Sequence, residues 1–127
     1  MIATPDDRVI AYASLAMTAI DRRAAPRMVA RQAPDPVPAL LLGRLAVDKE
    51  FAGLDIGTAL VAYVLATAIE LNAKAACRAV VVAALNPGAR SWWERLGFHS
   101  FHPDDPTDTD LYLLTSEIEA TLGQLAE

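Results

Sequence analysis

Apolar residues of the chain gather into runs that are separated by proline, glycine and charged positions. Residues 8–20 form a run of β-branched, aromatic and small residues between charged ends, which predicts a strand, although its alanines also allow a helix. Residues 39–48 and 78–85 are nearly continuous apolar runs of strand length, as is typical of strands buried on both faces of a sheet. A shorter apolar run at residues 111–114 predicts a last strand.

Helical segments lie between and after these strands. Residues 58–71 contain neither glycine nor proline and are apolar almost all round, which predicts a helix covered on more than one side, within the domain or by a partner subunit. Residues 89–96 predict a short helix that ends at Gly97, since glycine readily takes the left-handed conformation found there. Residues 116–126 predict a terminal helix, whereas residues 21–38, rich in arginine and proline, predict an irregular connection.

The order of these elements predicts the fold class. The order is strand, connection, strand, helix, strand, helix, strand, helix, and the middle strand–helix–strand unit is long enough for a parallel crossover. This indicates an α/β or α+β domain built around a mixed sheet. The length of 127 residues predicts a single domain over residues 1–127, and 54% hydrophobic residues can give it a sizeable core.

Composition and charge exclude several classes of function. A net charge of -5 disfavours non-specific nucleic-acid binding by the body of the domain, whose one basic segment is residues 21–38. Cys77, the sole cysteine, cannot form an internal disulfide and fits a reducing cytoplasm. His99 and His102 lie in an aspartate-rich loop where histidines are usually solvated, so we predict no metal site. The sequence start shows no secretory pattern and the apolar segments look too short or too interrupted to cross a bilayer, which predicts a cytoplasmic protein.

Three separated segments share a pattern with one enzyme family. They are GRLAVDKEFAGLDIGTAL, the strand RAVVVAAL and NPGARSWWERLGF. In the last segment, the spacing Asn-x-x-Ala-x-x-x-Tyr-Glu-x-x-Gly-Phe is kept by Asn86, Ala89, Glu94, Gly97 and Phe98. The chain therefore resembles the GNAT acetyltransferases over roughly residues 8–115. It looks most like the toxin branch of that family, which acetylates aminoacyl-tRNA and is paired with a ribbon-helix-helix antitoxin.

The resemblance implies a V-shaped gap between two diverging parallel strands, residues 40–48 and 78–85, that takes up acetyl-coenzyme A (acetyl-CoA). Strand backbone would hold the pantetheine arm and polarise the thioester, and the following turn and helix start would hold the pyrophosphate. The implied cofactor-binding residues are Leu45, Ala46, Val47, Ala52, Gly53, Asp55, Gly57, Thr58 and Asn86. The implied catalytic positions are Asn86 and Trp93, the latter where the family has the tyrosine that protonates the departing thiolate.

The sequence departs from the family pattern in three respects. Ala52 stands in place of glutamine or arginine, and Asp55 in place of glycine; the Asp55 carboxylate would repel a pyrophosphate by about 3 kcal/mol at ~5 Å and an effective dielectric of ~20. Trp93 cannot replace the tyrosine as an acid, because an indole N–H does not give up its proton usefully. The N-terminal strand and helices of the family, which form much of the acceptor pocket, have no counterpart before residue 8. These departures predict weakened acetyl-CoA binding and impaired or lost catalysis.

Two functions from different classes stay open. One is an N-acetyltransferase, impaired or inactive, that uses acetyl-CoA and an acceptor amine such as that of aminoacyl-tRNA. The alternative is a non-catalytic binding or regulatory module that docks an antitoxin-like or DNA-binding partner. The short N-terminal part leaves apolar surface of the sheet and of the helix at residues 58–71 uncovered. We therefore predict that another chain covers it, in a homo-oligomer or in a complex with a partner protein.

Overall fold

The computed structural model describes residues 2–3, 5–6, 8–31, 33–51, 53, 55–74 and 76–125. At its centre is a six-stranded sheet with the order β1-β2-β3-β4-β6-β5. The strands are β1 (Ile2–Ala3), β2 (Val9–Ile20), β3 (Val37–Val47), β4 (Ala79–Ala83), β5 (His99–Ser100) and β6 (Asp110–Leu114). The helices are α1 (Arg27–Ala30), α2 (Ile56–Lys74), α3 (Pro87–Arg95) and α4 (Ile118–Leu125), with short 3-10 helices η1 (Lys49–Phe51) and η2 (Thr115–Glu117).

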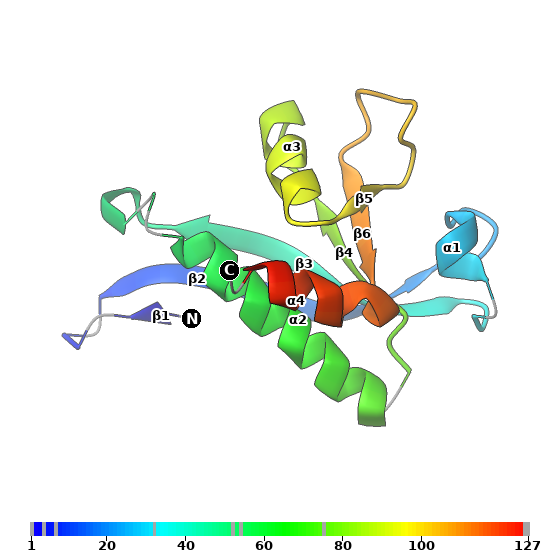
Figure 1. Ribbon diagram of the computed structural model, residues 1–127, viewed down its shortest axis with the longest axis horizontal. Helices are drawn as coiled ribbons and strands as arrows, with labels where there is room; N and C mark the ends of the chain where they lie inside the picture. Colours follow the sequence, from blue (N-terminus) through cyan, green and yellow to red (C-terminus); the bar gives the residue numbers. More distant parts are fainter. Residues whose placement is uncertain are drawn as a thin grey trace.

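The sheet is mixed. β2 and β3 form a long antiparallel pair, and α2 then crosses over so that β4 runs parallel to β3. β6 is antiparallel to both of its neighbours, β4 and β5. α2 and α4 lie next to each other across one face of this sheet (Figure 1). The predicted α/β class with a mixed sheet is therefore confirmed.

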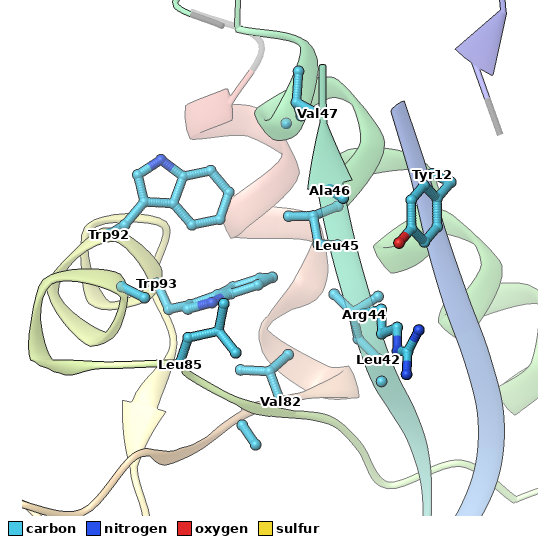
Figure 2. Close-up of a pocket in the computed structure, with 14 residues that line it drawn as sticks. Tyr12, Leu42, Arg44, Leu45, Ala46, Val47, Val82, Leu85, Trp92 and Trp93 are labelled. Carbon is cyan, nitrogen blue, oxygen red and sulfur yellow. The ribbon is translucent and has the colours of Figure 1, made fainter. Parts of the chain in front are cut away.

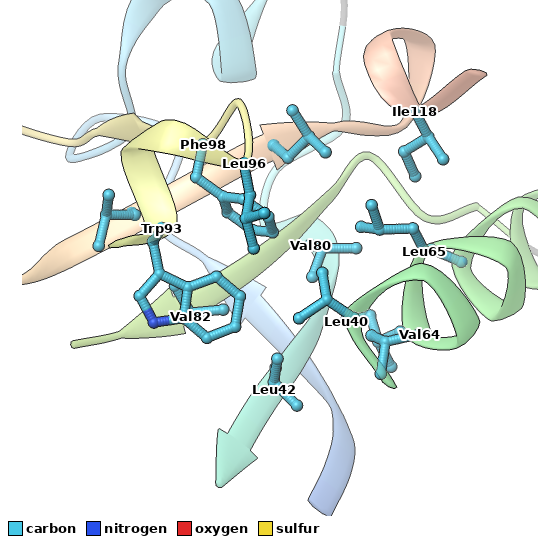
Figure 3. Packing of buried hydrophobic residues seen from close by; sticks show 14 of the residues in the cluster. Leu40, Leu42, Val64, Leu65, Val80, Val82, Trp93, Leu96, Phe98 and Ile118 are labelled. Atoms are coloured by element: carbon cyan, nitrogen blue, oxygen red, sulfur yellow. The ribbon is translucent and has the colours of Figure 1, made fainter. Parts of the chain in front are cut away.

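Side chains on the two faces of the sheet form two apolar clusters. Val80 and Val82 of β4 belong to the larger cluster, together with residues of α2, α3 and α4 (Figure 3). Ala79 and Val81, which alternate with them along the strand, belong to a smaller cluster on the other face with Val29 of α1. β4 is thus buried on both faces, as its continuous apolar run predicted.

The crossover helix α2 is longer than predicted, because it begins at Ile56 and ends at Lys74. By length and composition alone its 19 residues could cross a membrane, whereas the sequence predicted apolar segments too short or too interrupted to do so. In the structure α2 instead connects two parallel strands of one sheet, and the sheet and α4 cover it while Tyr63 stays 69% exposed. Its buried residues are Leu60, Val61, Val64, Leu65 and Ala68.

Other segments also differ from expectation. The connection over residues 21–38 contains the short helix α1, whose Val29 is buried, and β3 already begins at Val37. β4 ends at Ala83 rather than at Leu85, and Leu85 is 93% exposed. The two-residue strands β1 and β5 were not predicted, because so short a strand leaves no alternation to recognise.

β3 and β4 separate halfway along β3. Their parallel pairing begins at Ala39 and stops where Leu42 faces Val82, while β3 continues beside β2 as far as Val47. The register between β2 and β3 shifts at the same place and leaves Gly43 as an extra residue, a β-bulge. A bulge bends its strand and interrupts regular pairing. The predicted divergence of the two strands is confirmed, and it opens the space described next.

Candidate functional site

The gap between the diverging strands is a cleft of about 510 Å³, a size typical of small-molecule sites. Its walls come from β2 and β3 on one side and from the end of β4 and α3 on the other (Figure 2). Most of the lining is apolar, and Tyr12 and Arg44 are the titratable side chains among the described residues that form it. The lining residues are Tyr12, Leu42, Gly43, Arg44, Leu45, Ala46, Val47, Gly57, Val82, Ala83, Leu85, Ala89, Trp92 and Trp93.

Alternation along β3 decides which backbone groups face the cleft. The N–H of Asp48 donates to the carbonyl oxygen of Ile10 at 2.6 Å, so these two residues form a hydrogen-bonded pair of the β2–β3 ladder. Because hydrogen-bonded and non-bonded pairs alternate in an antiparallel ladder, Ala46 also directs its N–H at β2. The N–H groups of Leu45 and Val47 point the other way, toward the cleft. Two of the three predicted backbone positions therefore present donors to it.

The first turn of α2 brings further backbone donors to the mouth of the cleft. The N–H of Ala59 donates to the carbonyl of Asp55, so the N–H groups of residues 56–58 have no partner within the helix. Gly57 lines the cleft, and a Cβ atom there would lie 3.5 Å from the Trp92 ring. Free N–H groups and the positive end of the helix dipole make such a position suitable for an anion.

The turn before α2 contains two residues in the left-handed conformation, Gly53 with φ 83° and Asp55 with φ 59°. Aspartate tolerates this region better than most residues, which explains how the turn forms without a glycine at position 55. Thr58 lies in the first turn of α2 and is not one of the described residues that line the cleft. Ala52, predicted to bind the cofactor, lies outside the described residues.

Arg8 fixes the start of the same turn. Its guanidinium forms ion pairs with Asp48 and Glu50, each at 2.9 Å, and lies 5.6 Å from the centre of the Phe51 ring. These three residues follow the end of β3 directly, so Arg8 ties the beginning of the turn to β2. The backbone N–H of Glu50 and the Arg8 guanidinium lower the pKa of Asp48.

We expect Arg8→Ala to raise the pKa of Asp48 part of the way to its ordinary value, because the N–H of Glu50 keeps its bond. A carboxyl group with a lowered pKa stabilises the fold above its unfolded-state pKa, and this contribution is lost as pH falls through the folded-state pKa. The variant should therefore lose a little stability at neutral pH, and the loss is small because these ion pairs are exposed. Its free energy of unfolding should also fall less than that of the unaltered protein as the pH is lowered. An NMR titration of the Asp48 carboxyl measures the shift, and an unchanged pKa contradicts the expectation.

Trp93 is both a core residue and part of the cleft wall. Its side chain is 7% exposed, and its ring contacts Trp92 at 4.9 Å and Phe98 at 5.1 Å between ring centres, both edge to face. Trp93 also belongs to the core cluster that contains Leu42 and Val82 of the sheet, so it packs α3 on the sheet, which is the structural role expected for large apolar residues on a short helix. The wall at this position offers an indole and no phenol.

Asn86 caps the helix that carries the two tryptophans. Its Oδ1 accepts a hydrogen bond from the N–H of Ala89 at 2.9 Å at the start of α3. Asn86 is not one of the described residues that line the cleft, although Ala89 is. The structure thus gives Asn86 a capping role, and its part in catalysis or cofactor binding stays a prediction.

Several residues of the cleft were not predicted as site residues, and Tyr12 of β2 and Leu85 beyond the end of β4 are two of them. Tyr12 reaches the cleft because its Cα is paired with that of Ala46 across the β2–β3 ladder. The apolar run of residues 8–20 indicates a strand but carries no information about its register with a partner. Leu85 lies at the end of the predicted strand 78–85, and its exposure follows from the earlier end of β4.

Other reactive side chains lie outside the cleft. Burial raises the pKa of the Cys77 thiol, which makes it a poor nucleophile. His99 lies 2.9 Å from Glu117 and His102 lies 3.0 Å from Asp108, and within the described ranges no three His, Cys, Asp or Glu side chains group as metal ligands. The described lining of the cleft holds no serine, cysteine or histidine. The cleft is therefore suited to reactions in which backbone N–H groups hold an activated substrate beside the group that it reacts with.

The model of the Acetyltransferase (GNAT) family matches residues 1–98, so the chain belongs to the GNAT acetyltransferases. A tRNA-acetylating toxin of Mycobacterium tuberculosis is 34% identical over 118 residues, which are 93% of this chain and 69% of that protein. The structure of AtaT complexed with acetyl-methionyl-tRNAfMet is similar with a TM-score of 0.80 and 27% identity, over 92% of this chain and 69% of that one. The structure of a mutant AtaT toxin bound to the C-terminus of the antitoxin AtaR and acetyl-CoA is similar with a TM-score of 0.74 and 25% identity, over 91% of this chain and 67% of that one. The chain spans about two thirds of the length of such relatives, and 65% of the matching chain in a KacTA–DNA complex. These similarities confirm the resemblance to the toxin branch.

Proposed function

We propose that the cleft binds acetyl-CoA and that the domain transfers the acetyl group to an amino group. The observation that carries this proposal is the separation of β3 from β4 after Leu42, because it exposes backbone donors of β3 beside the start of α2. Membership of the GNAT family and similarity to a toxin structure that contains acetyl-CoA support it.

Each part of the cleft has its own role in this proposal. The N–H groups of Leu45 and Val47 hold the pantetheine arm and polarise the thioester, since preorganised donors stabilise the charge that develops on the carbonyl oxygen. The N–H groups at the start of α2 hold the pyrophosphate, and Gly57 leaves room for it. The bound thioester supplies an activated acetyl group, so the acceptor amine attacks without a protein nucleophile.

Two side chains make this site weaker than the family pattern. Asp55 brings a negative charge to the start of α2, where the pyrophosphate is proposed to bind. Trp93 occupies the position of the family's tyrosine acid and is packed into the core. We therefore propose weakened acetyl-CoA binding and impaired catalysis.

The acceptor we propose is the amino group of an aminoacyl-tRNA. Similarity to a tRNA-acetylating toxin and to AtaT bound to an acetylated tRNA supports this choice. The domain is acidic, yet four exposed arginines gather around α1 and can contact RNA phosphates: Arg22, Arg23, Arg27 and Arg31. By the same similarity, the proposed protein partner is an antitoxin, in a cytoplasmic complex, and a homo-oligomer stays a prediction.

A non-catalytic binding module is the second candidate, and Trp93 is the observation that favours it. An indole in place of the acid removes a catalytic group, and its ring is a buried part of the apolar core. Such a module would keep the scaffold and dock an antitoxin-like or DNA-binding partner.

Titration with acetyl-CoA separates the two candidates. Both tryptophans of the chain, Trp92 and Trp93, line the cleft, so their fluorescence should change as it fills, and calorimetry gives the Kd. Micromolar binding, together with transfer of labelled acetyl groups to bulk aminoacyl-tRNA, supports the enzyme. No binding at millimolar acetyl-CoA contradicts the proposal and leaves the binding module.

A further inference from the structure

Acetyl transfer to an amine requires a proton to leave the nitrogen and a proton to reach the departing sulfur. Among the described residues that line the cleft, Tyr12 alone has a side-chain hydroxyl. We propose that Tyr12 relays this proton from the acceptor amine to the coenzyme thiolate, in place of the acid that Trp93 cannot supply. This inference rests on the proposed acetyl transfer.

Tyr12 lies on the face of the sheet opposite to α2. Ala13 and Leu45 pack against the core cluster beneath α2, so the alternation of side chains places Tyr12 and Ala46 on the other face. Tyr12 is 42% exposed there, and Figure 2 shows its hydroxyl oxygen turned toward β3. The phenol therefore belongs to the cleft and is also open to solvent.

The two faces of the sheet suit the two substrates. The proposed pyrophosphate site at Gly57 belongs to α2, on the face that α2, α3 and α4 cover. An acceptor as large as a tRNA end needs the open face, where Tyr12 and Arg44 line the cleft. Donor and acceptor would then reach the thioester from opposite faces, with Tyr12 on the acceptor's side.

The relay balances without another reactant. The neutral amine attacks the thioester carbonyl carbon, so that a C–N bond forms and the C–S bond breaks. The amine proton passes to the Tyr12 oxygen while the proton of Tyr12 passes to the sulfur. Tyr12 ends the reaction as a phenol, and coenzyme A leaves as the thiol.

Neighbouring groups do not compete for this role. Arg44 lines the same part of the cleft, but a guanidinium keeps its protons and serves better to attract acceptor phosphate. The nearest alternatives by chemistry, Cys77, His99 and His102, are not among the described residues of the cleft. The proton path therefore leads to Tyr12.

The test replaces Tyr12 with phenylalanine, which keeps the ring and removes the hydroxyl. Tyr12→Phe should lower kcat for acetylation of bulk aminoacyl-tRNA about 100-fold, the usual size of a lost acid–base group, with the Kd for acetyl-CoA and the KM for tRNA nearly unchanged. Tyr63→Phe is the matched control, since it removes a phenol hydroxyl from the exposed side of α2 and should change nothing. Because Tyr12 is exposed, its variant should fold normally.

A second background separates proton transfer from substrate binding. Trp93→Tyr restores the tyrosine of the family pattern, so in that background Tyr12→Phe should cost less than about 10-fold in kcat, with Trp93→Phe as the control for lost packing. An unchanged kcat in Tyr12→Phe, a loss confined to KM, or the same loss in both backgrounds overturns the relay. Absence of transfer by the unaltered protein overturns the proposed function as well, and the acetyl-CoA titration shows whether binding or chemistry failed.

Discussion

Replacing Asp55 with asparagine is expected to strengthen acetyl-CoA binding by about 10- to 100-fold. Asp55 precedes α2 directly, beside the backbone donors proposed to hold the pyrophosphate. Two like charges at ~5 Å and an effective dielectric of ~20 repel by about 3 kcal/mol, which is about 100-fold in affinity, and the exposure of Asp55 reduces this. The carboxylate also offsets part of the positive potential at the N-terminus of α2, which would otherwise attract the pyrophosphate.

Asparagine is a matched substitute, because it tolerates the left-handed conformation at φ 59° and caps helices as well as aspartate. Asp55→Gly provides a second variant without the charge and without the cost of positive φ. Calorimetric titrations at low and high salt should show that the gain shrinks as salt screens the repulsion, while Asp104→Asn, in the exposed loop before β6, leaves the affinity unchanged. Equal affinities of Asp55→Asn and the unaltered protein at low salt would mean that the carboxylate does not face the ligand.

Replacing Gly57 with leucine is expected to weaken acetyl-CoA binding by about 100-fold or more. A Cβ atom at this position would lie 3.5 Å from Trp92 and 3.7 Å from Val47, which is ordinary contact. The remaining carbons of leucine must then occupy the mouth of the cleft between α3 and β3, where the pyrophosphate is proposed to lie. The free energy of unfolding should not fall, because leucine favours a helix over glycine by about 1 kcal/mol.

The matched control is Ala59→Leu, which adds similar bulk to an exposed position in the same turn of α2. Calorimetry and tryptophan fluorescence should show normal acetyl-CoA binding in Ala59→Leu and none at micromolar ligand in Gly57→Leu. Thermal unfolding checks that both variants are folded. Normal binding by Gly57→Leu refutes the placement of the ligand at this end of the cleft.

Much of the architecture could be read from the chain without its structure. Apolar runs at residues 39–48 and 78–85, separated by a segment of helical character, indicated two buried strands and a crossover. The spacing from Asn86 to Phe98 indicated the family. These features are local, because an apolar run, a turn residue or a motif is complete within a short stretch of sequence. Helix and strand ends were less accurate, as the lengths of α2 and β4 show.

The site depended on relations between distant segments. Whether Leu45, Ala46 or Val47 turns its N–H into the cleft is decided by the pairing of β3 with β2, and the same pairing brings Tyr12 beside Ala46. A change of one residue in that register would reverse these directions, since side chains and hydrogen bonds both alternate with a period of two. The chain by itself therefore determined which segments fold into strands and helices and to which family they belong. The tertiary structure alone decided which groups face the cleft, because strand register and the bulge at Gly43 are set by packing between strands and leave no pattern within either one.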